Sequence, residues 1–290
     1  MKLLSMVEQT LRIAIPYLFA AAGGTLAERS GIVSLALEGY MLAGAFSAVL
    51  GGFMTGSAWG AIAGGAFGGL VFAALHALAT LRFKANQIVI GVALNLLAIG
   101  ATRLFLKLVF HSSSNSARVS GFGESASASV ATFANPLFFV GLLTTPALAW
   151  MMKRTAFGLR VRAAGEHPRA AETLGVDVGR IRLVAVLVSG VLAGLGGAYL
   201  AIEQHQFTDE MTAGRGFIAL AAVITGSWRP VRAGVACLLF AAAETLQIQL
   251  QTLAVLPSQV LSMIPYVVTL IVLTGFVGRS EEPAALGKGA

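Results

Sequence analysis

Apolar runs long enough to cross a lipid bilayer recur along almost the whole chain. Eight windows have about 20 mostly apolar residues, the length of a transmembrane helix, and a ninth is shorter. The eight are 10–27, 33–52, 58–80, 87–108, 134–152, 181–202, 231–250 and 257–277, and the ninth is 212–228. Because lipid offers the backbone no hydrogen bonds, such windows fold as helices. The sequence therefore predicts an all-α, polytopic helical membrane protein with about 8–9 transmembrane segments, forming a single domain over residues 1–290.

Composition supports this fold class and excludes several functions. Hydrophobic residues make up 57% of the chain, charged residues 11%, and the mean hydropathy is +0.81, which is unlike a soluble domain. The net charge of +7 does not indicate nucleic-acid binding, because the positive residues lie between apolar windows. The chain has one cysteine, no phosphate-binding-loop motif and no His-Glu-x-x-His motif. We therefore expect no metal, no cofactor and no enzyme activity of its own.

The stretch 153–182 is the most strongly charged part of the chain. It holds seven of the 20 Lys and Arg residues and lies between two apolar windows, so the positive-inside rule predicts a cytoplasmic loop. Alternation then predicts an external N-terminus, an external loop over 109–133 and a cytoplasmic C-terminus. If 212–228 were re-entrant, the C-terminus would move outside. The 109–133 loop is either a linker or a surface that receives an external partner.

A short helix is predicted inside the 153–182 loop. Pro168 is suited to the first helical position and Gly175 to the position just past the end, so the helix lies between them. Ala170, Ala171 and Leu174 are expected on one side of it. A basic loop with an apolar-faced helix predicts a docking surface, and the alternative is a solvated connector.

Several polar side chains fall inside the apolar windows. An ionisable group there costs about 2.5–3.5 kcal/mol and is usually retained only if it is paired or faces a wet cavity. Because residues three or four apart share a helix face, Glu244, Gln247 and Gln251 predict a polar stripe. Ordinary hydrogen bonding between helices is the alternative. The candidate translocation path consists of Glu38, Asn95, Phe217, Glu244 and Gln247.

Two further features bear on the organisation of the spans. Glu28 and Arg29 lie at the end of the first window, where they either contribute to a polar path or are solvated at the interface. Residues 30–36 resemble residues 215–221, which indicates two structural repeats. Transporters commonly bind their substrates where such repeats meet.

The motifs together resemble the permease subunits of bacterial nucleoside ABC importers, whose wider family includes ribose and other simple-sugar permeases. The resemblance lies in residues 28–45, in 158–175, in 189–197 and in 212–222, and it covers nearly the whole chain. It implies the ABC importer permease fold with two structural repeats, in a multi-pass protein of the bacterial cytoplasmic (inner) membrane. The pair Glu38-Gly39 favours nucleosides over sugars.

The resemblance also implies partners and a coupling site. Family members work with an ABC ATPase, with a second homologous permease as a heterodimer, and with an external substrate-binding lipoprotein. The segment 166–175 would be the cytoplasmic coupling helix that fits a cleft of the ATPase. The ATPase-coupling residues would be Gly158, Leu159, Arg160, Gly165, Glu166, Pro168, Ala170, Ala171, Leu174 and Gly175.

Two alternatives to a nucleoside importer subunit remain at this point. The first is a simple-sugar permease of the same family. The second is an ion-coupled secondary carrier, in which Glu38 or Glu244 would be the proton or sodium site.

Overall fold

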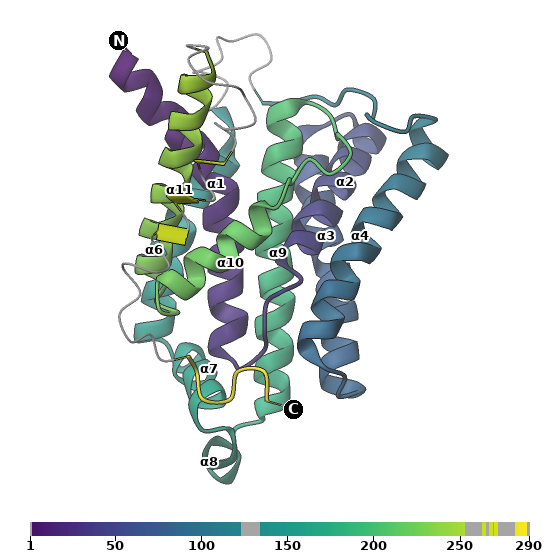
Figure 1. Cartoon of the computed structure of the whole chain (residues 1–290). Helices are drawn as coiled ribbons and strands as arrows, with labels where there is room; N and C mark the ends of the chain where they lie inside the picture. Colours follow the sequence, from purple (N-terminus) through teal and green to yellow (C-terminus); the bar gives the residue numbers. More distant parts are fainter. Residues whose placement is uncertain are drawn as a thin grey trace.

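The computed structural model describes residues 2–122, 134–252, 263–264, 267–268, 270–271 and 282–288 (Figure 1). The helices are α1 (Lys2–Arg29), α2 (Leu37–Thr55), α3 (Ala58–Ala77), the π-helix η1 (Leu78–Arg82), α4 (Gln87–Phe110), α6 (Pro136–Arg154), α7 (Ala156–Glu166), α8 (Pro168–Thr173), α9 (Val178–Gln204), α10 (Arg215–Thr225) and α11 (Pro230–Thr252). Within these ranges, 7 helices are long and apolar enough to cross a membrane. The predicted all-α membrane fold is confirmed. The predicted span at 257–277 lies mostly outside the described residues, so the count of 8–9 stays a prediction.

Short polar side chains fix where several helices begin. Asn86 accepts hydrogen bonds from the backbone N–H groups of residues 88 and 89 at the start of α4. Asn135, followed by a proline, caps α6 in the same way, and Asp177 caps α9. These caps satisfy N–H groups that have no partner inside the helix. Because α9 begins at Val178, the last five residues of the predicted 153–182 loop belong to this helix.

Glycines bring α2, α3 and α9 into close contact. A Cβ atom on Gly44 of α2 would overlap the backbone of Gly194 in α9, and one on Gly194 would overlap the carbonyl oxygen of Gly65 in α3. A Cβ on Gly64 of α3 would meet the carbonyl oxygen of Ser47 in α2. Small residues allow helix backbones to approach this closely in membranes. The three helices therefore form a tightly packed unit.

Two helices begin after a non-helical segment that itself enters the bundle. α1 ends at Arg29, and residues 30–36, which include Gly31 with φ of +99°, lead to α2. α9 ends at Gln204, and residues 205–214 lead to α10, which begins at mid-height of the bundle (Figure 1). The resemblance of 30–36 to 215–221 does not correspond to shared local structure, since the first is non-helical and the second opens α10. The left-handed Gly31 explains why 30–36 leaves the helix.

The chain places its loops at two opposite ends of the bundle. α7 and α8 lie at one end, together with the last described residues, 282–288 (Figure 1). The N-terminus of α1 lies at the other end, together with the described part of the predicted 109–133 loop. Residues 123–133 of that loop lie outside the described residues.

Candidate functional site

Residues 155–177 form a helical surface at one end of the bundle, here called the α7–α8 surface. Thr155 caps α7 by accepting a hydrogen bond from the N–H of Gly158, 3.1 Å away. A Cβ on Gly158 would meet the backbone of Met152, so only glycine fits this turn between α6 and α7. Farther along α7, a Cβ on Gly165 would overlap the carbonyl oxygen of Arg29 at the end of α1. α7 is thereby pressed against α1, and Leu159 and Arg160 are exposed on its other side.

The predicted short helix in this segment is confirmed as α8. Pro168 is its first residue, and Gly175 follows it with φ of +81°, a conformation that glycine adopts without strain. The prediction of one common apolar face is wrong. Ala171 is buried against Ala164 and Val178, whereas Ala170 is exposed and Leu174 is 84% exposed. A helix of 6 residues packs only a narrow strip, and Ala171 alone lies in that strip.

Glu166 links the α7–α8 surface to the rest of the bundle. Its carboxylate forms an ion pair with Arg29 at 3.2 Å, and the Arg29 Nε donates to the carbonyl oxygen of Trp228 at 2.9 Å. The segment 282–288 also binds here, because the N–H of Ala285 donates to the carbonyl oxygen of Gly165 at 2.8 Å. A cavity of about 680 Å³ lies between α8 and this segment. It is lined by Glu166, His167, Pro168, Arg169, Ala170, Glu172, Val178, Arg182, Ala284, Ala285 and Lys288.

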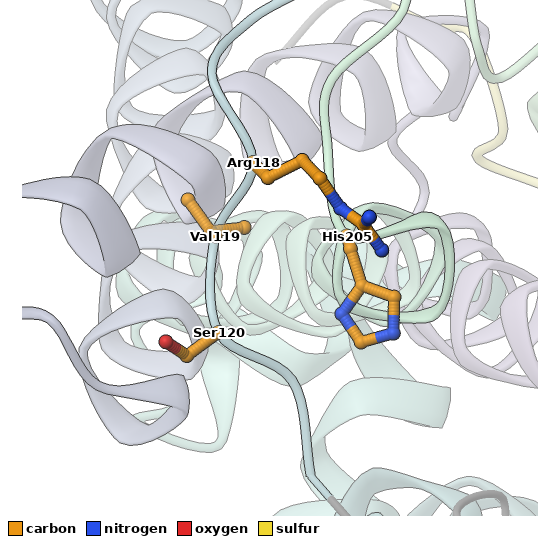
Figure 2. Close-up of a pocket in the computed structure, with 4 residues that line it drawn as sticks. All are labelled: Arg118, Val119, Ser120 and His205. Atoms are coloured by element: carbon orange, nitrogen blue, oxygen red, sulfur yellow. The ribbon is translucent and has the colours of Figure 1, made fainter. Parts of the chain in front are cut away.

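At the opposite end, the described part of the 109–133 loop pairs with the segment that follows α9. The N–H of Ser116 donates to the carbonyl oxygen of Phe207, and the N–H of Val119 donates to that of His205, both at 2.9 Å. Figure 2 shows Arg118, Val119, Ser120 and His205, which line a cavity of about 440 Å³. Residues 114–119 are therefore held against the segment that follows α9, so this part of the loop is not a simple linker.

Glu38 joins the beginnings of α2 and α10. It is the second residue of α2, and its side chain accepts hydrogen bonds from three groups at the start of α10. The Oε1 atom accepts from the Thr212 hydroxyl at 2.5 Å and from the Gly214 N–H at 2.9 Å, and Oε2 accepts from the Gly216 N–H at 2.7 Å. A carboxylate is favoured at a helix N-terminus because the N–H groups there carry partial positive charge. Glu38 is thus a buried cap of α10.

Asn95 has the same role for α2. Its Oδ1 accepts from the Gly39 N–H at 2.8 Å, and its Nδ2 donates to the Leu35 carbonyl oxygen at 2.9 Å. The side chain therefore fastens α4 to the point where residues 30–36 become α2. Asn95 meets Glu38 through the backbone of Gly39.

Glu244 is the second acid of the candidate path, and it is also paired. It accepts from the Tyr17 hydroxyl at 2.5 Å and from Arg215 at 2.8 Å, so α1, α10 and α11 meet at this carboxylate. Gln247 is half-buried one turn later, and Gln251 is exposed. The remaining candidate, Phe217, lies on α10 and is 47% exposed.

The structure adds partners that the sequence did not reveal. Glu28 is 2% exposed, so the alternative of a solvated side chain is wrong. Its Oε2 accepts from the indole Nε1 of Trp228 at 2.5 Å, and its Oε1 accepts from the Ser34 N–H at 3.1 Å. Glu28 and Trp228 are 200 positions apart, and the partners of Glu38 are also distant, at 174 to 178 positions, so no local pattern indicates such pairs.

Comparison with known proteins gives full-length similarity to transport proteins. A family described as "Branched-chain amino acid transport system / permease component" matches residues 6–273. A guanosine ABC transporter permease protein of Bacillus subtilis is 36% identical, with 97% of this chain and 94% of the relative covered. A nucleoside ABC transporter permease protein of Lactococcus lactis subsp. cremoris is 39% identical, with 97% and 95% covered. A solved structure described as a "putative metal-chelate type ABC transporter" in an inward-facing conformation is 19% identical, with 93% of this chain and 85% of that chain covered. The TM-score of 0.53 shows that the two chains share a fold.

Proposed function

Since the chain belongs to the family of branched-chain amino acid transport system permease components, we propose that it is the membrane subunit of an ABC importer for nucleosides. The observation that carries this proposal is the match over nearly the whole chain to two permeases named for guanosine or nucleosides. The protein is accordingly a multi-pass protein of the bacterial cytoplasmic membrane. ATP would be hydrolysed by a partner ATPase, and cargo would be delivered by an external substrate-binding protein.

The buried acids support an uncharged cargo. The Glu38 carboxylate accepts hydrogen bonds from N–H groups at the start of α10, and Glu244 is paired with Arg215. Both acids therefore serve contacts within the chain, and a nucleoside, which is neutral, needs no countercharge from the path. The same contacts weigh against the ion-coupled carrier, because each acid would have to give up its partners to bind a proton or a sodium ion.

The α7–α8 surface has the properties of an ATPase-docking site. It faces away from the bundle and exposes Leu174, Ala170 and Leu159. An exposed leucine on a loop that lies between two spans is suited to insertion into a cleft of a soluble partner. ATP-driven movement of that partner would push on α7 and α8. A second, homologous permease would complete the path as a heterodimer.

The first experiment is affinity purification of the chain from its native membrane in mild detergent, followed by an ATPase assay. We expect an ATPase and a second permease to co-purify, and hydrolysis to rise when binding protein loaded with nucleoside is added. A rise with ribose-loaded binding protein alone would favour the sugar permease instead. Recovery of the chain alone, with uptake into proteoliposomes that needs no ATP, would contradict the proposal and establish the carrier.

A further inference from the structure

We propose that α10 transmits the displacement of the α7–α8 surface to the middle of the membrane, with Trp228 and Glu38 as the positioning residues at its two ends. This inference rests on the proposed function, since it concerns the response to the ATPase. α10 has 11 residues and is therefore ~16 Å long, about half the thickness of the hydrocarbon core. One end lies near α7 and the other begins at mid-height of the bundle (Figure 1).

The end of α10 near α7 is tied to the residues that hold the α7–α8 surface. Trp228 is 6% exposed, and its indole donates to Glu28 at 2.5 Å. The next residue, Arg29, binds the Trp228 carbonyl oxygen through Nε and Glu166 of α7 through its terminal nitrogen. Two consecutive residues at the end of α1 thus hold both α7 and the end of α10. Arg29 is the one side chain that connects Glu166 to Trp228, so a shift of Glu166 displaces Trp228 through it.

The backbone at this joint is held in an unusual conformation. Ser227 and Trp228 have φ values of 53° and 54°, in the left-handed region that non-glycine residues rarely adopt. Such residues persist only where the surroundings fix them, and they concentrate at functional segments. Here the indole and carbonyl contacts of Trp228 supply that restraint. The turn between α10 and α11 is therefore positioned by α1.

The other end of α10 is tied to α2 through Glu38. Three groups of the α10 start, the Thr212 hydroxyl and the N–H groups of Gly214 and Gly216, donate to this one carboxylate. A Cβ on Gly216 would meet the Glu38 Cα at 2.5 Å, so the two helix starts are in direct backbone contact. Movement of α10 along its axis therefore moves the start of α2 with it. α2 is in turn packed through glycines against α3 and α9.

The test compares two variants with a matched control in the purified complex. Trp228→Phe keeps an aromatic side chain and removes the donor to Glu28, and Glu38→Gln keeps the size and removes the charge. Trp59→Phe is the control, since Trp59 is 64% exposed at the opposite end. The readout is the ratio of ATPase activity with loaded binding protein to basal activity, measured per assembled complex, which a purely structural defect would not change.

We expect both variants to retain the ATPase subunit and to show an about tenfold lower ratio. Loss of a hydrogen bond to a charged group changes an equilibrium constant by about that factor. The control should match the wild type. A ratio within about twofold of wild type in either variant would overturn the inference.

If Trp228→Phe assembles poorly, the double variant Glu28→Gln/Trp228→Phe removes the buried charge as well as the indole, and it should assemble but stay uncoupled. A coupled double variant also overturns the inference. A wild-type chain that retains no ATPase contradicts the proposed function instead.

Discussion

Leu174 is an apolar side chain that the fold leaves outside. It is 84% exposed in the described residues, so replacing it changes little inside the protein. We expect Leu174→Ser to leave the thermal stability in detergent within about 0.5 kcal/mol of wild type, and to lower the amount of co-purified ATPase several-fold. Met54→Ser is the matched control, because Met54 is 77% exposed at the other end of the bundle. Equal ATPase recovery for the two variants would contradict the docking role.

The pair formed by Arg215 and Glu244 allows a second prediction for single residues. Both side chains are largely buried, and removal of one partner from a buried ion pair costs about 3–5 kcal/mol because the other charge is left unpaired. Glu244→Gln should therefore lower the thermal midpoint strongly. The double variant Arg215→Met/Glu244→Gln should recover most of the loss, since it removes both charges and keeps an acceptor for Tyr17. The single variant Arg215→Met completes the comparison. If the double variant loses as much stability as the two single variants together, the pair is not coupled.

Sequence patterns located the buried polar residues but not their roles. Glu38, Asn95 and Glu244 stand out because polar groups are costly inside apolar windows, and each is indeed buried or largely buried. Their partners lie far along the chain, as for Glu38 and Gly216, which are 178 positions apart. A carboxylate that lines a path and one that caps a distant helix have the same local sequence. Only the packing of α2 against α10 distinguishes them.

At the scale of helices, contact between glycines leads to a prediction about α2 and α9. A Cβ on Gly44 would lie 2.8 Å from the carbonyl carbon of Gly194 and closer still to its Cα. Gly44→Ala should force the helices apart and destabilise the protein by about 1–3 kcal/mol, measured as a lower thermal midpoint. Gly100→Ala in α4 is the control, because nothing lies within 4 Å of its added Cβ. That variant should be neutral or gain about 0.5–1 kcal/mol from helix propensity.

Hydropathy predicted the long helices better than the broken ones. The window 87–108 corresponds closely to α4, and 134–152 to α6. The windows 33–52 and 212–228 overlap the two helices that begin late, at Leu37 and Arg215. An extended apolar segment and an apolar helix carry the same side chains, so hydropathy cannot separate them. The contacts that hold the extended parts, such as the bond from the Val33 N–H to Gln87, are made with other segments.

For the molecule as a whole, the proposed orientation predicts which loops each side of the membrane can reach. Cys237 is the single cysteine of the chain and is fully buried, so an introduced cysteine gives a clean signal. In right-side-out vesicles, a membrane-impermeant maleimide should label Ser113→Cys and leave Arg160→Cys unlabelled. Both positions are exposed, at opposite ends of the bundle. Labelling of position 160 alone would reverse the orientation and remove the α7–α8 surface from the cytoplasm. The unsubstituted chain should stay unlabelled.

The short length of α10 also bears on how the chain is made. Residues 205–225 combine a non-helical stretch with an 11-residue helix, so they cannot satisfy their own backbone in lipid and cannot insert as an independent unit. In the folded chain, Glu38 and the backbone of residues 114–119 supply hydrogen-bond partners to this segment. Both precede residue 205, so they have left the ribosome before this segment emerges. The order of synthesis thus supplies these hydrogen-bond partners before residues 205–225 need them, and a permutation that placed α10 first would lose this advantage.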